Sequence, residues 1–142
     1  MELPTFLRHI TLATRDPDRS AEFFRRTMGW KFIERPGNTK METRWLEMGP
    51  GQELHLVEVA DFEISDYEQE FGRHFALSCP IGEFEALKAR LVENGAKLIA
   101  PGRDTPFERF FFSSPEGYVF EIIEAEKFQD NIDQLFREGG KE

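Results

Sequence analysis

The chain has 142 residues, enough for one compact domain or for two small modules that share a hydrophobic core. Hydrophobic residues make up 39% of it and charged residues 32%, as in soluble globular proteins, and no apolar run approaches the ~20 residues that cross a bilayer. The net charge of -9 repels phosphate backbones, so we expect neither a nucleic-acid nor a membrane partner.

Two further features indicate the compartment. The N-terminal residues lack the basic region, apolar core and cleavage site of a signal peptide. Cys79 is the single cysteine, which excludes a disulfide within the chain and is typical of a reducing environment. The sequence therefore predicts a cytoplasmic protein.

Alternating apolar residues and turn signals predict one helix and four strands in the first half of the chain. The helix begins near Asp16-Pro17-Asp18 and ends at Gly29. The strands precede and follow it, at residues 6–14, 30–35, 43–48 and 53–59.

The same series is predicted again in the second half. A strand at 73–79 precedes a helix whose apolar stripe is Phe84, Leu87 and Leu91, with Gly95 just past its end. Three more strands follow, within residues 97–100, 108–113 and 118–124. A final amphipathic helix is predicted at 126–137, before a polar tail.

The two halves match each other in sequence as well as in order. His9 and His74 are 65 positions apart, as are Arg44 and Arg109, and His55 and Glu121 are 66 apart. We interpret the difference as one extra residue in the second turn of the second copy. The pattern predicts an α+β fold in which two βαβββ modules, about 6–60 and 73–125, form one domain at 1–125, joined by residues 61–72 and followed by a helix and tail at 126–142.

The repeat places the three histidines of the chain at related positions. His9 and His74 lie in the first strand of each copy, and His55 and Glu121 lie in the last. Side chains alternate between the two faces of a sheet. The apolar side chains of these strands mark the face that packs on the helix, so the histidines and Glu121 lie on the opposite face. If both sheets curve around a shared space, all four side chains point into it.

Imidazole nitrogens and a carboxylate suit Zn, Ni, Fe or Mn better than Mg or Ca. A lone strand histidine is more often structural than a ligand, and Glu121 alone would more often be exposed or ion-paired. Yet every histidine occupies one of the repeated positions, and a carboxylate inside the apolar run 118–123 would cost several kcal/mol to bury without a cationic partner. We therefore predict that His9, His55, His74 and Glu121 bind one divalent metal.

At this point the sequence resembles the vicinal oxygen chelate superfamily, the glyoxalase / bleomycin resistance protein / extradiol dioxygenase group. The resemblance extends over residues 6–125, in LRHITLATRDPDRSAEFFRRTMGWK, GQELHLVE, RHFALSC and FFFSSPEGYVFEIIE. The turn Ser114-Pro115-Glu116-Gly117 stands where the family has Asp-Pro-Asp-Gly, and Glu121 is the glutamate four residues after the glycine. The resemblance implies the same four ligands, a homodimer, and modules that pair within one chain or by exchange between two.

The resemblance also implies chemistry in which the metal chelates adjacent oxygens of a small substrate. We expect a lyase or isomerase that acts on a substrate such as a 2-oxoaldehyde–thiol adduct, with Glu121 as the catalytic base. Small glyoxalase I enzymes usually carry Glu or Gln where this chain has His55, so His55 is the ligand expected to be weakest or absent. Glu53, on the same strand face as His55, could assist the proton abstraction, with a strand-end carboxylate in water as the alternative.

Other activities of the superfamily stay open. A thiol transferase would use His9, His74 and Glu121, although its potassium-binding loop is not found here. An extradiol dioxygenase uses two histidines and a glutamate on iron but is usually longer. A metal-independent drug-binding protein would rely on the aromatic residues and the acidic surface.

Four residues are candidates for substrate binding. Arg44 and Arg109 could hold a substrate carboxylate or phosphate, although exposed strand arginines are as common. Trp45 and Phe110 could line the cleft, with core packing as the alternative for them and for Phe112. Cys79 is interpreted as a small apolar residue on the helix-packed face.

Overall fold

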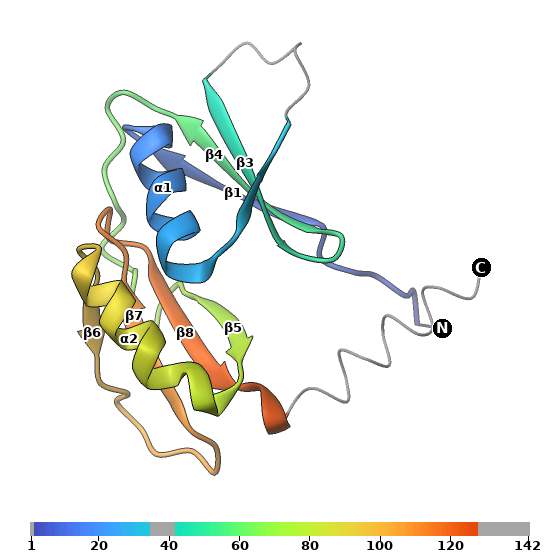
Figure 1. Cartoon of the computed structure of the whole chain (residues 1–142), viewed down its shortest axis with the longest axis vertical. Helices are drawn as coiled ribbons and strands as arrows, with labels where there is room; N and C mark the ends of the chain where they lie inside the picture. The colour runs from blue at the N-terminus through green and yellow to red at the C-terminus, as the bar shows by residue number, and fades with distance from the viewer. Residues whose placement is uncertain (1, 35–41, 128–142) are drawn as a thin grey trace. The chain divides into compact units, whose positions relative to one another are not determined.

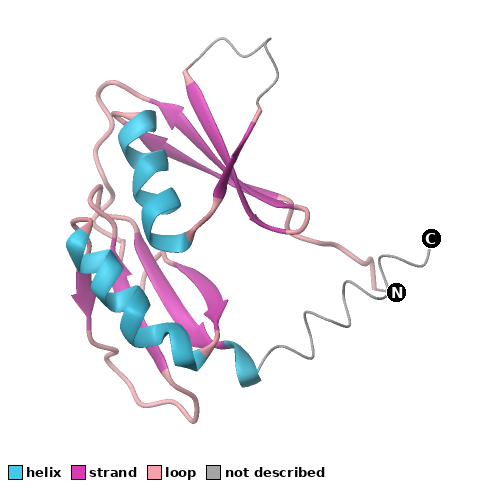
Figure 2. Cartoon of the chain, in the orientation of Figure 1, coloured by secondary structure: helices cyan, strands magenta, loops and turns pink. Residues whose placement is uncertain are grey.

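The computed structural model describes residues 2–34 and 42–127 (Figure 1). The chain divides into two compact units, residues 1–63 and residues 64–142, called here the N-terminal and the C-terminal unit. The boundary falls within the predicted connector 61–72. Among the described residues, each unit contains one α-helix packed on one sheet (Figure 2).

The N-terminal unit has the order β1, α1, β2, β3, β4, at His9–Thr14, Pro17–Met28, Lys31–Ile33, Thr43–Gly49 and Gln52–Glu58. Its four-stranded sheet has the order β1-β4-β3-β2. Strand β1 is parallel to β4, and the remaining pairs are antiparallel.

The C-terminal unit repeats this plan with β5, a 3₁₀ turn, α2, β6, β7 and β8. Their bounds are Phe75–Cys79, Ile81–Glu83, Phe84–Glu93, Lys97–Ile99, Arg109–Ser113 and Val119–Glu124. The sheet order is β5-β8-β7-β6, again with one parallel pair, β5 with β8. Two mixed sheets, each with one helix, confirm the predicted α+β fold of two βαβββ modules.

Some predicted boundaries differ from the observed ones. The first strand begins at His9 and not at residue 6, because its ladder with β4 begins at the pair His9 and Glu53. Of the predicted C-terminal helix 126–137, only a 3₁₀ turn at Ala125–Lys127 is described, and the rest lies outside the described residues. The predicted turn 36–38 and the loop 36–41 also lie outside them.

The two ends of helix α1 are set by the residues that the sequence predicted as its start and stop signals. Asp16 caps it by accepting a hydrogen bond from the Arg19 backbone N–H at 3.1 Å, and Pro17 occupies the first turn. Gly29 ends the helix with φ 72°, a left-handed conformation that glycine adopts without a steric penalty. The cap thereby sets the direction in which the chain enters β2.

The hydrophobic core of each unit lies between its helix and the facing side of its sheet. In the N-terminal unit, the buried residues include Phe23 and Phe24 of α1 and Leu46, Leu54 and Leu56 of the sheet. The C-terminal unit uses larger side chains: Phe84, Leu87 and Leu91 of α2 cover Phe110, Phe112, Phe120 and Ile122. Much of the high phenylalanine content of the chain is therefore core.

The strand register corrects the predicted alignment of the two copies. Trp45 lies opposite His55, and Phe111 lies opposite Glu121, so Trp45 corresponds to Phe111 and not to Phe110. The predicted equivalence of Arg44 and Arg109 is therefore wrong: Arg44 corresponds to Phe110.

The extra residue of the second copy lies earlier in the chain than predicted. Gly29 and Gly95, which both have positive φ values just past a helix, are already 66 positions apart, whereas His9 and His74 are 65 apart. The insertion therefore lies between β5 and the end of α2, and not in the turn before β8. The one-residue difference matters because it moves side chains to the opposite face of the strand.

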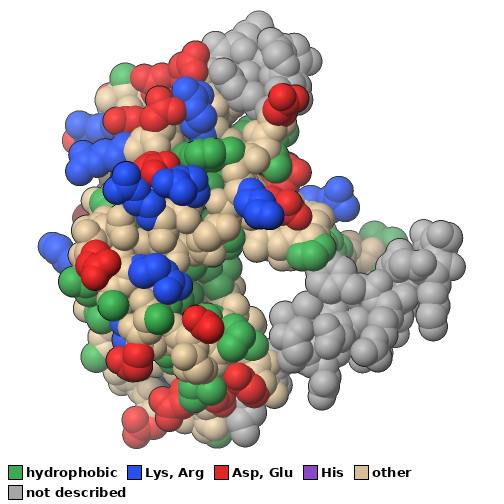
Figure 3. Space-filling model, viewed as in Figure 1, with side chains coloured by type: hydrophobic (Ala, Val, Ile, Leu, Met, Phe, Trp, Pro, Cys, Tyr) green, Lys and Arg blue, Asp and Glu red, His purple; other side chains and the backbone are tan. Residues whose placement is uncertain are grey.

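Charged side chains of both signs are interspersed on the face shown in Figure 3, including the region of both helices. Helix α1 carries an example, in which Glu22 pairs with Arg25 and Arg26. Neither helix of the described residues has the length and apolarity needed to cross a membrane.

Candidate functional site

The predicted ligands lie in two pairs, one in each unit. His9 and His55 are neighbours in the N-terminal unit, and His74 and Glu121 are neighbours in the C-terminal unit. Within residues 2–34 and 42–127, no three histidine, cysteine, aspartate or glutamate side chains are grouped as a metal site would require. Each pair is therefore described by itself.

In the N-terminal unit, His55 lies in a stack of three aromatic rings. Its imidazole is 4.2 Å from the ring of His9 and 3.8 Å from that of Trp45, with interplanar angles of 14° and 5°. Trp45 is brought there by the antiparallel ladder of β3 and β4, in which it lies directly opposite His55. Stacking on both faces limits the rotation of the His55 ring.

The edge of the His55 ring is also occupied. Its Nε2 lies 2.9 Å from Oε1 of Glu53, two residues earlier on the same face of β4. A nitrogen that hydrogen-bonds a carboxylate is not the one that offers a lone pair to a metal. In this arrangement, Glu53 is the hydrogen-bonding partner of His55, whereas the sequence indicated it as a possible aid to proton abstraction.

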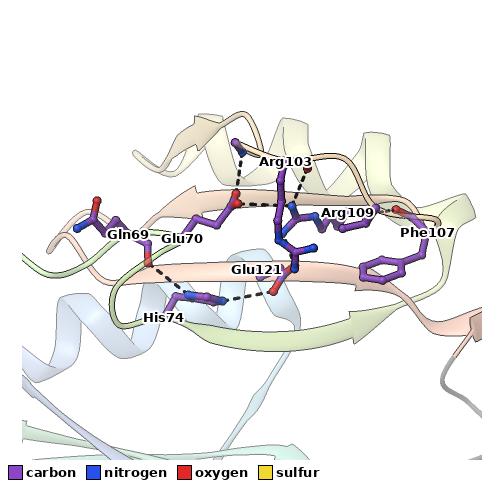
Figure 4. A network of polar contacts seen from close by, with 9 residues as sticks. Gln69, Glu70, His74, Arg103, Phe107, Arg109 and Glu121 are labelled. Atoms are coloured by element: carbon purple, nitrogen blue, oxygen red, sulfur yellow. Dashed lines mark hydrogen bonds and ion pairs between the residues drawn. The ribbon is translucent and has the colours of Figure 1, made fainter.

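In the C-terminal unit, His74 is oriented from both sides of its ring (Figure 4). Its Nδ1 lies 3.3 Å from the backbone carbonyl oxygen of Gln69, and its Nε2 lies 3.4 Å from Oε1 of Glu121. Since a carbonyl oxygen only accepts hydrogen bonds, Nδ1 is the nitrogen that donates. Nε2 then faces the carboxylate with a lone pair or with a second proton.

This geometry fits a metal ion. A lone pair facing a carboxylate is repulsive unless a cation or a proton lies between them. Two ligands of one tetrahedral cation, bound at the distances usual for nitrogen and oxygen, are roughly 3.4 Å apart. A histidine ligand also commonly donates its other ring N–H to a backbone carbonyl, as His74 does here. The donors of this pair therefore suit a divalent transition metal.

The other oxygen of Glu121 is held by Arg109 (Figure 4). Nη1 of Arg109 donates to Oε2 of Glu121 at 2.9 Å, and Nη2 donates to the carbonyl oxygen of Arg103 at 2.8 Å. Nη2 also lies 3.6 Å from Oε2 of Glu70, an ion pair that is too long for a hydrogen bond. The Arg109 side chain is only 3% exposed, so these groups take up its charge.

Two contacts with the Phe111 ring and one contact with a loop complete this environment. The guanidinium of Arg109 lies 5.1 Å from the centre of the Phe111 ring, and His74 meets the same ring edge-on at 5.3 Å. Glu70 accepts a hydrogen bond from the backbone N–H of Gly102 at 2.8 Å, which links the connector to the loop before β7. This hydrogen bond holds Glu70 of the connector in place.

The residues predicted to bind substrate have different surroundings. Phe110 packs edge-on against Phe84 of α2 at 5.2 Å, on the helix side of the sheet, whereas Phe111 lies beside Glu121. Phe111 was missed because the predicted alignment was one residue out of register; the pairing of β7 with β8 places it opposite Glu121. Arg109, which could have been an exposed strand arginine, is instead a buried ion-paired one.

Arg44 lies on the helix side of its sheet and is bound by acidic neighbours. It donates to Asp18 at 2.6 Å and to Glu42 at 3.2 Å, and these hydrogen bonds, that of Asp18 above all, raise the pKa of its guanidinium above the ordinary value. Arg44 and Trp45 line a cavity of about 360 Å³ with Phe32, Ile33, Glu34 and Thr43. These two remain candidates for contacts with a small molecule.

Comparison with known proteins identifies the fold and the family. A protein from Arabidopsis thaliana named "Glyoxylase I 4" is 23% identical over 128 residues, which cover 86% of this chain and 72% of that protein. A putative glyoxalase family protein from Bacillus anthracis has a TM-score of 0.69 and 21% identity, over 87% of this chain and 98% of that one.

A third relative was solved with a metal. It is a mutant of the fosfomycin resistance protein FosX from Listeria monocytogenes, complexed with Mn(II) and 1S,2S-dihydroxypropylphosphonic acid. Its TM-score is 0.68 and its identity 17%, over 85% of this chain and 90% of that one. The model of the Glyoxalase/Bleomycin resistance protein/Dioxygenase superfamily matches residues 6–122. The chain belongs to this superfamily.

Proposed function

We propose that this protein is a metal-dependent lyase or isomerase that acts on a small substrate with two adjacent oxygens, such as the adduct of a 2-oxoaldehyde with a thiol. The observation that carries the proposal is the pair of His74 and Glu121, in which a nitrogen and an oxygen face each other at 3.4 Å while their other atoms are held by Gln69 and Arg109. Such a pair is oriented as metal ligands are.

The proposed ligands are those predicted from the sequence: His9, His55, His74 and Glu121. Nitrogen and carboxylate donors suit Zn, Ni, Fe or Mn. His55 is proposed as the weakest of the four, because its Nε2 already hydrogen-bonds Glu53 and its ring is stacked on both faces. A bound divalent metal would act as a Lewis acid toward the substrate oxygens.

Glu121 is proposed as the base. Arg109 holds its Oε2, so Oε1, once released as a ligand, is the oxygen that would take the proton from the adduct carbon that carries sulfur and hydroxyl. The same oxygen would return the proton to the neighbouring carbonyl carbon, while the hydroxyl proton moves to the oxygen of that carbon, and the adduct becomes a thioester of a 2-hydroxy acid. Trp45, whose ring stacks on His55, would contact the rest of the substrate.

The test combines metal analysis with turnover. The purified protein is stripped with a chelator, reloaded with Zn, Ni, Mn or Fe(II), and assayed with methylglyoxal and a panel of thiols. We expect one metal per chain, and thioester formation that depends on it. Glu121→Gln should lower kcat by about 10²–10⁴-fold, and Glu47→Gln, an exposed strand glutamate, should leave it unchanged.

Metal retention in the alanine variants tests the ligand set. His74→Ala should lose the metal and His55→Ala should lose the least affinity. A parent protein that takes up none of the four metals would contradict the proposal. Metal binding without thioester formation, but with opening of an epoxide or cleavage of a catechol ring, would favour a thiol transferase or a dioxygenase instead. Tight, metal-independent binding of a cationic drug would indicate a non-catalytic resistance protein.

A further inference from the structure

We propose that Arg109 is a positioning residue that makes Glu121 a ligand through one oxygen only, and that Glu70 is the counter-charge that allows it to do so. This inference rests on the proposed metal site, and it assigns two residues to that site that are not themselves ligands.

The first argument is the division of the two carboxylate oxygens. Arg109 donates to Oε2 of Glu121 at 2.9 Å, whereas Oε1 faces Nε2 of His74 (Figure 4). A carboxylate with one oxygen held in a charge-assisted hydrogen bond cannot turn to offer both oxygens to a metal. Such a carboxylate would take up one position of a bound ion and would leave room for substrate oxygens.

The second argument is that Arg109 itself is fixed. Its Nη2 donates to the Arg103 carbonyl oxygen at 2.8 Å, and its guanidinium lies 5.1 Å from the centre of the Phe111 ring. Arginine presents its donors in a planar fork, so anchoring one nitrogen sets the direction of the other. A lysine has one nitrogen and cannot make both contacts from one place.

The third argument is charge. Arg109 alone beside Glu121 would cancel the negative charge that attracts a cation. Glu70, with its Oε2 at 3.6 Å from Nη2 of Arg109, supplies a second carboxylate. With His74 neutral, one positive and two negative charges leave an excess of one negative charge at the site. Glu70 is itself held in place by the backbone N–H of Gly102.

The experiment measures the affinity and the visible spectrum of bound Co(II) in four proteins: the parent, Arg109→Lys, Glu70→Gln and Arg103→Met. Chelator competition should show that Arg109→Lys binds Co(II) about 10–100-fold more weakly, as expected when an outer contact of a ligand is lost. Its spectrum should also change, because Glu121 is freed to bind through both oxygens. Glu70→Gln should weaken binding less, without a change in the spectrum.

Arg103→Met is the matched control. It removes an exposed arginine from the same loop but keeps the backbone carbonyl that Arg109 uses, so both readouts should equal those of the parent. Circular dichroism establishes that each variant is folded. Glu70→Gln replaces only a carboxylate oxygen by an amide nitrogen, so it still tests the role of the negative charge if Arg109→Lys does not fold.

The possible failures can be told apart. A parent that binds no Co(II) contradicts the proposed function itself. A parent that binds Co(II), together with an Arg109→Lys variant of the same affinity and spectrum, overturns the positioning role and leaves the metal site intact. An unchanged affinity in Glu70→Gln overturns the role of Glu70 as the counter-charge.

Discussion

Phe110 and Phe111 are neighbours in the chain but have different environments. Phe110 meets Phe84 of the helix, and Phe111 meets His74 and the guanidinium of Arg109. Both are at most 6% exposed, so burial does not separate them. The side of the sheet on which each one lies decides whether it belongs to the core or to the candidate site.

Cys79 is a residue whose environment can be tested directly. It lies at the end of β5 on the helix side, as the alternation predicted, and is half-buried. Burial, followed by the nearby Glu83, raises the pKa of its thiol above the ordinary range.

Because only the thiolate reacts, a raised pKa leaves less of the reactive form at a given pH. We expect alkylation of Cys79 by iodoacetamide, followed by mass spectrometry from pH 7 to 10, to be slower than that of free cysteine and to recover in urea. Reaction in the folded protein at the rate of free cysteine would show that the thiol is neither buried nor near negative charge.

At the scale of the element, the turn before β8 positions Glu121 in the chain. The backbone N–H of Gly117 donates to the Ser114 carbonyl oxygen at 2.8 Å, and that of Tyr118 donates to the Ser114 hydroxyl at 3.1 Å. Gly117 has φ 103°, and an added Cβ would lie 3.1 Å from the side chain of Ile64. The turn therefore requires glycine at this position.

The change Gly117→Ala should lower the free energy of unfolding by about 1–3 kcal/mol, since a left-handed backbone is strained with any side chain. Gly82→Ala is the control: a Cβ there meets nothing within 4 Å, and the backbone φ is not positive. It should be neutral or stabilise the protein by up to about 1 kcal/mol. Urea unfolding of the two variants measures the difference, and equal stabilities would contradict the assigned turn.

At the scale of the whole molecule, the property to test is the oligomeric state in solution. The superfamily resemblance predicts a homodimer, and a sheet with a helix on one face needs cover for the other face. Light scattering across a dilution series should give a mass of twice 16.6 kDa. A mass of 16.6 kDa at all concentrations would show that one chain is sufficient.

Within residues 6–125, the sequence by itself determined the order of elements and the repeat, because alternation, helix caps and turn glycines are local signals, and its motifs resembled those of the family. It also placed His9, His55 and Glu121 on the strand faces opposite the helices, since side-chain alternation has a period of two. His74 lies one residue before β5, which begins at Phe75, and not within the strand as predicted.

Only the tertiary structure decided which strand residues lie opposite each other. Strand register depends on pairing between segments far apart in the chain, and an error of one residue exchanged Phe110 for Phe111 and matched Arg44 with Arg109. The contacts of Arg109 with Glu121 and Glu70 also come from separate segments, so spacing along the chain could not reveal that this arginine is buried between two carboxylates.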